Sequence, residues 1–419
     1  MKIVEVFARE ILDSNGEPTV EAEVTLENGI KALGQVPSGT SVGKNEAYEL
    51  RDNDPKSFFG RGVLKAINNV KTIIHDSLTG QDAYNQKKID ELLVELDGTQ
   101  NKSRLGANAI LGVSMAISRA AARSQKIPFY QYFGRLSDHS IFELPSPLIL
   151  LIEGGKHGDW VTDIQEFFII PQKEKYFSFK ERLKVGAEIY QTLKKILREN
   201  NYSTSVGMEG GFCPKEIKSN EEAFDLIIQA VQDACYTLGD EAVLGIDVAS
   251  SELFSDGNYT LKNERKNLNT HEWLEQLSKW QRKYSIFFIE DPFAQEEWES
   301  WTTFTQNFSQ IQTVGDDLLT TTPKRIQKAI DLRAVKGLIL KPNQIGTISE
   351  TVDAIRLSQK AGLTTIVSHR SGETNDDLIA DLCVGTGSLF CKLGAPNRGE
   401  RVAKYNRLLR IEERLKKDE

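Results

Sequence analysis

Six short apolar runs between Val243 and Gly394 each end on an ionisable residue. They read VLGID, IFFIE, QTVGD, GLILK, TTIVSH and LFCK, and they end on Asp247, Glu290, Asp316, Lys341, His369 and Lys392. The three carboxylates are hard oxygen ligands, which suit Mg²⁺ better than Zn²⁺. A lysine at the end of an apolar strand and near another cation can have a lowered pKa and act as a base. The alternative is that the carboxylates form salt bridges with the two lysines.

The spacing of these runs indicates which elements carry them. After the first gap, successive ends are roughly 23 to 28 residues apart, the length of one strand–helix unit in a barrel or a doubly wound sheet. Continuous apolar runs suit parallel strands that are buried on both faces. Because the C-terminal ends of such strands meet at one mouth, we expect the six side chains to face a single cavity.

Other segments carry side chains suited to the same chemistry. In SHRSGE, Arg370 and Ser371 follow the histidine, and fixed guanidinium donors suit a phosphate or a carboxylate. SVGMEGG holds Glu209 among glycines, where an acid has little to pack against and is more often functional than structural. GGKHGDW and QEF contribute His157 and Glu166. Two glutamates, two lysines and a metal form a set suited to removing a proton next to a carboxylate, because the metal stabilises the enolate charge.

The chain is too long for one compact core, so we predict two domains, residues 1–134 and 135–419. In the first, two predicted strands precede a run of helical patterns, which indicates an α+β domain. The strands lie at 3–8 and 18–26, and the helical patterns at 62–79, 86–96 and 106–126. The Gly- and Ser-rich centre of VPSGTSVGKNEAYEL, from Ser38 to Gly43, is typical of a mobile covering loop.

The second domain begins with two apolar strands, LILLIEGG and QEFFIIP. Helical patterns at 176–200 and 220–238 follow, and regular strand–helix alternation then runs from residue 243. This order predicts an α/β fold, a (β/α)8-type barrel with an irregular ββαα start. The tail from Arg401 reads as an amphipathic helix with a charged end.

Composition and charge exclude several classes of function. A formal net charge of -8 argues against a nucleic-acid binder that neutralises phosphates. Four separated cysteines indicate reduced thiols rather than a disulfide framework or a zinc site. The N-terminus has no secretory h-region, and no apolar run approaches the length of a membrane span. We therefore expect a cytoplasmic location.

Ten segments, in the same order along nearly the whole chain, resemble the enolase family. They are AREILDSNGEPTVEAEV, VPSGTSVG, DGTQNKSRLGANAILGVS, DIQEFFIIP, VGMEGGF, IEDPF, VGDDL, LKPNQIGT, SHRSGET and NRGERVAKYNRLLRIEE. The resemblance implies a small N-terminal α+β domain and a C-terminal barrel. It also implies the glycolytic dehydration of 2-phosphoglycerate to phosphoenolpyruvate, with two Mg²⁺ ions per site and a homodimer or a higher assembly of dimers.

Carried over by position, the resemblance also assigns roles. Asp247, Glu290 and Asp316 would hold the first Mg²⁺, and Ser41, in the covering loop, would help to hold the second. Lys341 would take the proton from carbon 2 of the substrate.

The remaining roles concern the departing hydroxyl and the substrate. Glu209, with Glu166 nearby, would deliver a proton to the hydroxyl, and Lys392 would support the carboxylate of the intermediate. Arg370 and Ser371 would bind the phosphate, and His157 and His369 would line the pocket.

The chain departs from the family pattern around the site. Met208 stands where an Asp is usual and Glu153 where an Asn is usual, while Val42 and Trp160 replace smaller or polar residues. Loss of a carboxylate beside Glu209 would shift the pKa of that acid. These departures favour, as an alternative, a specialised paralogue acting on a related phosphorylated or phosphonate acid. A second alternative is an enolase fold kept mainly for binding or scaffolding. Asn15 and Glu17 also differ from the pattern, at positions implied in dimer contacts.

Overall fold

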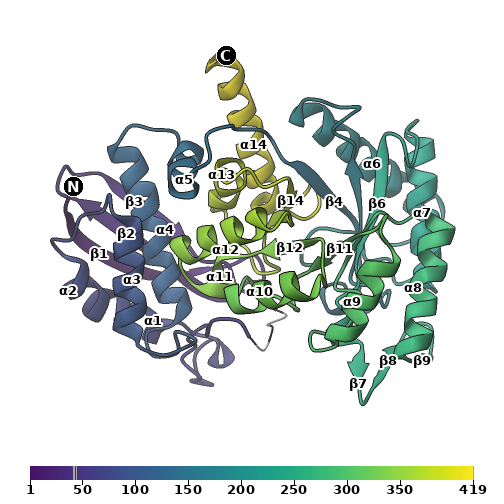
Figure 1. The fold of residues 1–419 in the computed structure, drawn as a ribbon, viewed down its shortest axis with the longest axis horizontal. Coiled ribbons are helices and arrows are strands. Elements are labelled where there is room, and N and C mark those ends of the chain that lie inside the picture. Colours follow the sequence, from purple (N-terminus) through teal and green to yellow (C-terminus); the bar gives the residue numbers. More distant parts are fainter. Residues whose placement is uncertain (41–42, 44, 419) are drawn as a thin grey trace.

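The computed structural model describes residues 1–40, 43 and 45–418, and in it a small sheet with helices precedes a large barrel (Figure 1). The sheet is antiparallel in the order β1-β2-β3, with strands β1 (Ile3–Leu12), β2 (Pro18–Leu26) and β3 (Lys31–Gln35). Its helices are α1 (Leu64–Asn69), α2 (His75–Leu78), α3 (Gln86–Asp97), α4 (Ala107–Ser124) and α5 (Phe129–Ser137), with a π-helical turn at Val70–Ile74 between α1 and α2.

Most of α4 is buried, which fits its alanine-rich sequence, and the helix packs on β2 and β3. The helical pattern predicted at 62–79 forms one continuous helical stretch, which runs from α1 through the π turn to α2. Strand β3 and helix α5 were not predicted, because KALGQ is too short to show alternation and FYQYFGRLS, with 9 residues, gives little helical periodicity. The expected domain boundary at residue 134 falls inside α5, and its position stays a prediction.

The second part of the chain is a closed barrel in the order β10-β11-β12-β13-β14-β4-β5-β6. Its strands are β4 (Ser146–Glu153), β5 (Glu166–Pro171), β6 (Ala242–Asp247), β10 (Phe288–Glu290), β11 (Gln312–Gly315), β12 (Gly337–Leu340), β13 (Thr364–Ser368) and β14 (Phe390–Lys392). Strand β5 is antiparallel to both neighbours, and the other neighbouring strands are parallel. Every residue of β4 and β5 is buried, as continuous apolar runs require.

Helices cover the outside of the barrel (Figure 1). They are α6 (Phe179–Glu199), α7 (Asn220–Asp233), α8 (Thr270–Tyr284), α9 (Trp298–Asn307), α10 (Pro323–Leu332), α12 (Ile348–Lys360), α13 (Leu378–Gly385) and α14 (Gly399–Asp418). The short α11 (Pro342–Ile345) follows β12 and packs on α4 and α12. With α6 and α7 both between β5 and β6, the irregular ββαα start is confirmed. A small sheet of β7 (Phe254–Ser255), β8 (Asn258–Leu261) and β9 (Lys266–Asn269) follows β6 and was not predicted.

Two hydrophobic clusters stabilise the barrel. A large one joins the helices to the outer face of the strands and continues into the first part of the chain. A smaller one comes from six strands, as the packed interior of such a barrel requires, and consists of Leu148, Phe168, Ile170, Phe288, Val314, Ile339 and Ile366. All four cysteines carry free thiols, as expected. Among the described residues, no helix is long and apolar enough to cross a membrane.

Candidate active site

Strand register places four acids in one row at the rim of the barrel. Glu153 pairs with Glu166, Glu166 with Asp247, and Asp247 with Glu290 across β4, β5, β6 and β10. Because β5 is antiparallel, it brings its first residue to this rim, whereas the parallel strands bring their last residues. The predicted convergence of strand ends on one cavity is therefore present, and Glu166 joins it from the opposite end of its strand.

The ammonium group of Lys392 lies among three of these carboxylates. Its Nζ is 2.8 Å from Glu290 Oε1, 2.9 Å from Asp247 Oδ2 and 3.0 Å from Glu166 Oε1. Burial opposes the charge on Lys392, but the surrounding carboxylates raise its pKa well above the ordinary value. Burial and the neighbouring acids likewise raise the pKa of Glu166 and of Glu290. One cation thus holds three mutually repelling groups together.

Asp316, the third predicted metal ligand, is bound by Lys341. The Lys341 Nζ contacts one carboxylate oxygen, and Gln344 Nε2 donates to the other at 3.0 Å. Burial lowers the pKa of Lys341, yet contact with Asp316 outweighs it, so the pKa is raised. The expectation of a lowered pKa at Lys341 is wrong for this arrangement, because the lysine has a carboxylate partner at contact distance. The salt bridges considered as the alternative are both present.

A further acid, Asp291, shapes the turn that carries Asp316. Its carboxylate accepts the backbone N–H of Asp316 at 2.9 Å and that of Asp317 at 2.8 Å. Ligand atoms of these three aspartates lie within 4.8 Å of one another. Burial and the charge of Asp316 raise the pKa of Asp317 to about 7. Sequence reasoning missed Asp291 and Asp317, although both stand beside predicted ligands in IEDPF and VGDDL.

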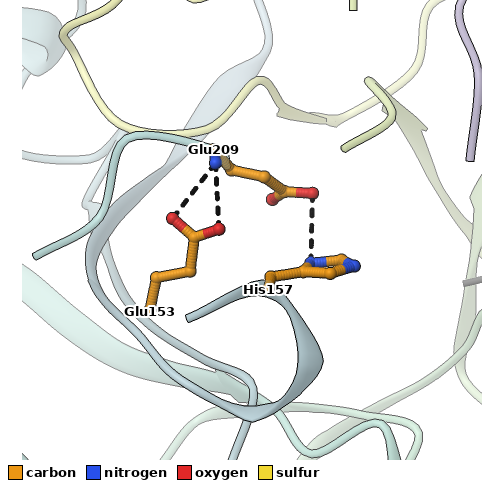
Figure 2. A group of neighbouring side chains, drawn as sticks. All are labelled: Glu153, His157 and Glu209. Carbon is orange, nitrogen blue, oxygen red and sulfur yellow. Dashed lines mark hydrogen bonds and ion pairs between the residues drawn. The ribbon is translucent and has the colours of Figure 1, made fainter. Parts of the chain in front are cut away.

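On the other side of the cavity, Glu209 lies between two histidines. Its carboxylate is 3.4 Å from His157 Nδ1 and 3.1 Å from His369 Nε2, and Figure 2 shows the His157 contact. Arg401 Nη1 donates to His369 Nδ1 at 2.7 Å. Since a guanidinium only donates, Nδ1 is an acceptor and the ring proton sits on Nε2, facing Glu209.

The pKa values of Glu209 and of both histidines are shifted downward on this side of the cavity. Burial is the main cause that lowers the pKa of His369, to about 3, and it also lowers that of His157. Burial alone would raise the pKa of Glu209, but His369, His157 and Arg401 bring it well below the ordinary value. Burial and the charge of Glu209 raise the pKa of the neighbouring Glu153.

Arg370 and Ser371 contact residues of the segment VPSGTSVGKNEAYEL, and their predicted binding of a phosphate stays a prediction. Arg370 Nη1 donates to Glu46 Oε2 at 2.8 Å and to Asn343 Oδ1 at 3.0 Å. Ser371 Oγ donates to Thr40 Oγ1 at 3.0 Å and accepts the Thr40 N–H at 2.9 Å. Glu46 was not predicted, although it follows the Gly- and Ser-rich stretch. The predicted ligand Ser41, and Val42 beside it, lie outside the described residues.

Most of these side chains line one cavity of about 490 Å³, its open mouth included, whereas Glu153, Glu290 and Arg401 lie behind its lining. Among the described residues that line it, eight carry a carboxylate and three a cationic side chain, so this part of the cavity wall is acidic. The donor set fits Mg²⁺: Asp247 and Asp316 supply hard oxygens, and Glu290 Oε2 is buried with no hydrogen-bond partner in the described part of the chain. Trp160 lies outside this lining set, beneath the Lys262 ammonium group, 3.9 Å from the ring centroid.

The fold and this cavity define a barrel protein with an acid-rich site at the mouth. The family model described as "Enolase, N-terminal domain" matches residues 3–133, and that described as "Enolase, C-terminal TIM barrel domain" matches residues 141–419. The chain belongs to the enolase family. Membership supports a metal-dependent lyase of the enolase type acting on a small molecule.

Proposed function

We propose that the chain catalyses the reversible dehydration of 2-phosphoglycerate to phosphoenolpyruvate with Mg²⁺. One observation carries the proposal: Lys341 and Glu209 line the same cavity, the first bound to Asp316 and the second held by two histidines. A base at the end of β12 and an acid on the turn between α6 and α7 match an elimination in which a proton and a hydroxyl leave neighbouring carbons.

The residues divide the work as follows. Lys341 accepts the proton from carbon 2. Glu209, whose pKa is lowered in the resting site, must first take up a proton and then delivers it to the departing hydroxyl. Lys392 pairs with the substrate carboxylate, with Glu166 beside it. Arg370 and Ser371 bind the phosphate, and His157 and His369 orient Glu209. Residues that would hold Mg²⁺ are Asp247, Glu290 and Asp316, with Ser41 for a second ion, and the metal stabilises the negative charge that develops on the carboxylate.

The state of Lys341 sets a condition on this chemistry. While Asp316 pairs with it, the lysine keeps its proton. Lys341 becomes a base when the Asp316 carboxylate has another cation as its partner. The proposal therefore requires a divalent cation, in agreement with the acidic wall of the cavity.

Turnover tests the proposal directly. Purified protein with Mg²⁺ and 2-phosphoglycerate should release phosphoenolpyruvate, and EDTA should abolish the reaction. Lys341→Ala should lose nearly all activity while Lys324→Ala, which removes an exposed lysine at the start of α10, keeps it. A folded, Mg²⁺-binding protein that forms no phosphoenolpyruvate would contradict the proposal.

A specialised paralogue is the second candidate. Met208 places a thioether, not a carboxylate, against Thr40 of the covering loop, with Thr40 Oγ1 3.6 Å from Sδ. Comparing turnover of 2-phosphoglycerate with that of related phosphorylated and phosphonate acids separates the two candidates. We also infer a homodimer or an assembly of dimers and a cytoplasmic, glycolytic role, and sedimentation measures the first of these.

A further inference from the structure

The carboxyl group of Glu153 is fully buried at the end of β4, directly beneath the turn that carries Glu209 (Figure 2). Its Oε1 accepts the Glu209 N–H at 2.9 Å, and its Oε2 accepts the Gly211 N–H at 3.0 Å. Hydrogen bonds from backbone N–H groups to a carboxylate are short and strong. The Glu153 side chain, at the end of β4, therefore holds this turn through hydrogen bonds to its backbone.

The close contact with Glu153 explains why VGMEGGF contains glycines. A Cβ at Gly207 would lie 2.6 Å from Glu153 Cδ, and one at Gly211 would lie 2.8 Å from Glu153 Cβ. Gly210 has a φ of +91°, which an L side chain rarely adopts. Glycine thus occupies the positions at which a larger side chain would collide with Glu153.

Other contacts fix the same segment from its far side. Arg401 Nη2 donates to the Met208 carbonyl at 3.0 Å, and the Ala395 N–H donates to the Glu209 carbonyl at 3.0 Å. The hydrogen bonds with Arg401, Ala395 and Glu153 together fix the position of the backbone at residue 209. That position aims the Glu209 carboxylate at His157 and His369.

We propose that Glu153 is a positioning residue for Glu209, holding the turn from which Glu209 protonates the departing hydroxyl. This inference rests on the proposed function. It also explains Met208: because the carboxylate that grips the turn comes from β4, the residue before Glu209 need not be acidic. The predicted loss of a carboxylate beside Glu209 is thus offset by Glu153.

The test compares two variants with a matched control. Glu153→Leu removes both acceptors, and Glu153→Gln restores one of them. Glu412→Leu is the control, because Glu412 is also buried and accepts two backbone N–H groups, those of Phe179 and Lys180, outside the cavity. Should Glu153→Leu fail to fold, Glu153→Gln carries the test with a smaller effect.

The first readout is amide hydrogen exchange without substrate. We expect exchange across residues 207–211 to accelerate at least ~10-fold in Glu153→Leu, less in Glu153→Gln, and not at all in Glu412→Leu. Unchanged protection of these amides in Glu153→Leu overturns the proposal.

The second readout separates the two half-reactions on 2-phosphoglycerate with Mg²⁺. Exchange of the C2 hydrogen with deuterated solvent reports Lys341, and formation of phosphoenolpyruvate reports Glu209. Dehydration should fall by roughly 10²-fold or more in Glu153→Leu, while C2 exchange falls less than about threefold. Equal losses in both, or no loss of dehydration, would refute a positioning role. If the wild-type protein does neither reaction, the proposed function fails, and amide exchange alone decides whether Glu153 holds the turn.

Discussion

Arg401 fixes the tautomer of His369, because its guanidinium donates to His369 Nδ1 at 2.7 Å and leaves Nε2 protonated toward Glu209. Arg401 comes from α14 and also binds the carbonyls of Arg370 and Ser371. The C-terminal helix therefore sets the tautomer of a group inside the cavity, a role that sequence reasoning did not assign.

Removing this guanidinium should let His369 titrate. In Arg401→Met the pKa of His369 should rise from about 3, because a nearby positive charge is lost and Nδ1 is released. Imidazole ¹⁵N resonances measured against pH report the change. Lys404→Met, which removes another buried α14 cation, one bound to Glu373, is the control. An unchanged His369 titration in Arg401→Met would contradict the assignment.

Lys392 should contribute strongly to stability when no metal is present. Lys392→Met leaves Glu166, Asp247 and Glu290 facing one another without their shared cation. Breaking a buried ion pair from one side destabilises proteins by about 3–5 kcal/mol, and we expect that range here at pH 7 in EDTA. Urea unfolding measures it, and saturating Mg²⁺ should recover part of the loss by binding the folded state. Equal stability of variant and wild type in EDTA would refute this.

Asp317 should make stability fall with pH in the absence of divalent cations. Its folded pKa, about 7, lies above its ordinary value of 3.8, so the folded state holds a proton that the unfolded state has released. Stability therefore declines as pH rises from about 4 to about 7 and is level above that range. Asp317→Asn should remove roughly 1–3 kcal/mol of this decline, less than the full shift implies because Asp317 is partly exposed.

Unfolding in EDTA at several pH values measures the Asp317 effect. Asp331→Asn, at an exposed acid near the end of α10, provides the control and should leave the pH dependence as it is. A decline of the same size in Asp317→Asn and wild type would show that other groups cause it.

Met208→Asp should reduce activity rather than raise it. The new carboxylate would lie beside the turn that Glu153 already holds and would displace the contact of the thioether with Thr40. Adding Glu153→Asn should recover part of the loss, because positions 153 and 208 then carry one carboxylate between them, as in wild type. Turnover of the two single variants, the double variant and wild type forms a double-mutant cycle, and additive effects would show that residues 153 and 208 are independent.

The barrel and its rim were predictable because strand periodicity and the ends of parallel strands are local features. Asp247, Asp316, Lys341 and Lys392 were found from those ends alone. Looking at the C-terminal ends of strands does not find Glu166, because β5 is antiparallel and its first residue lies at the rim of the barrel. Sequence reasoning did not identify Arg401, Glu46 or Asp291 as site residues. Each contacts a residue distant in sequence, and only the fold brings the two together. Glu153 was read as a departure, and its partner N–H groups lie more than 50 residues away.

Asp291 grips the turn of Asp316 and Asp317 through backbone N–H groups, in the same way that Glu153 grips the turn of Glu209. Every residue except proline offers an N–H, so the side chains on these turns can change while the turns keep their shape. In a saturation library at residues 209, 316 and 317, whose N–H groups these two acids accept, most substitutions should thus keep the turns in shape, whereas proline, which has no N–H, should open them.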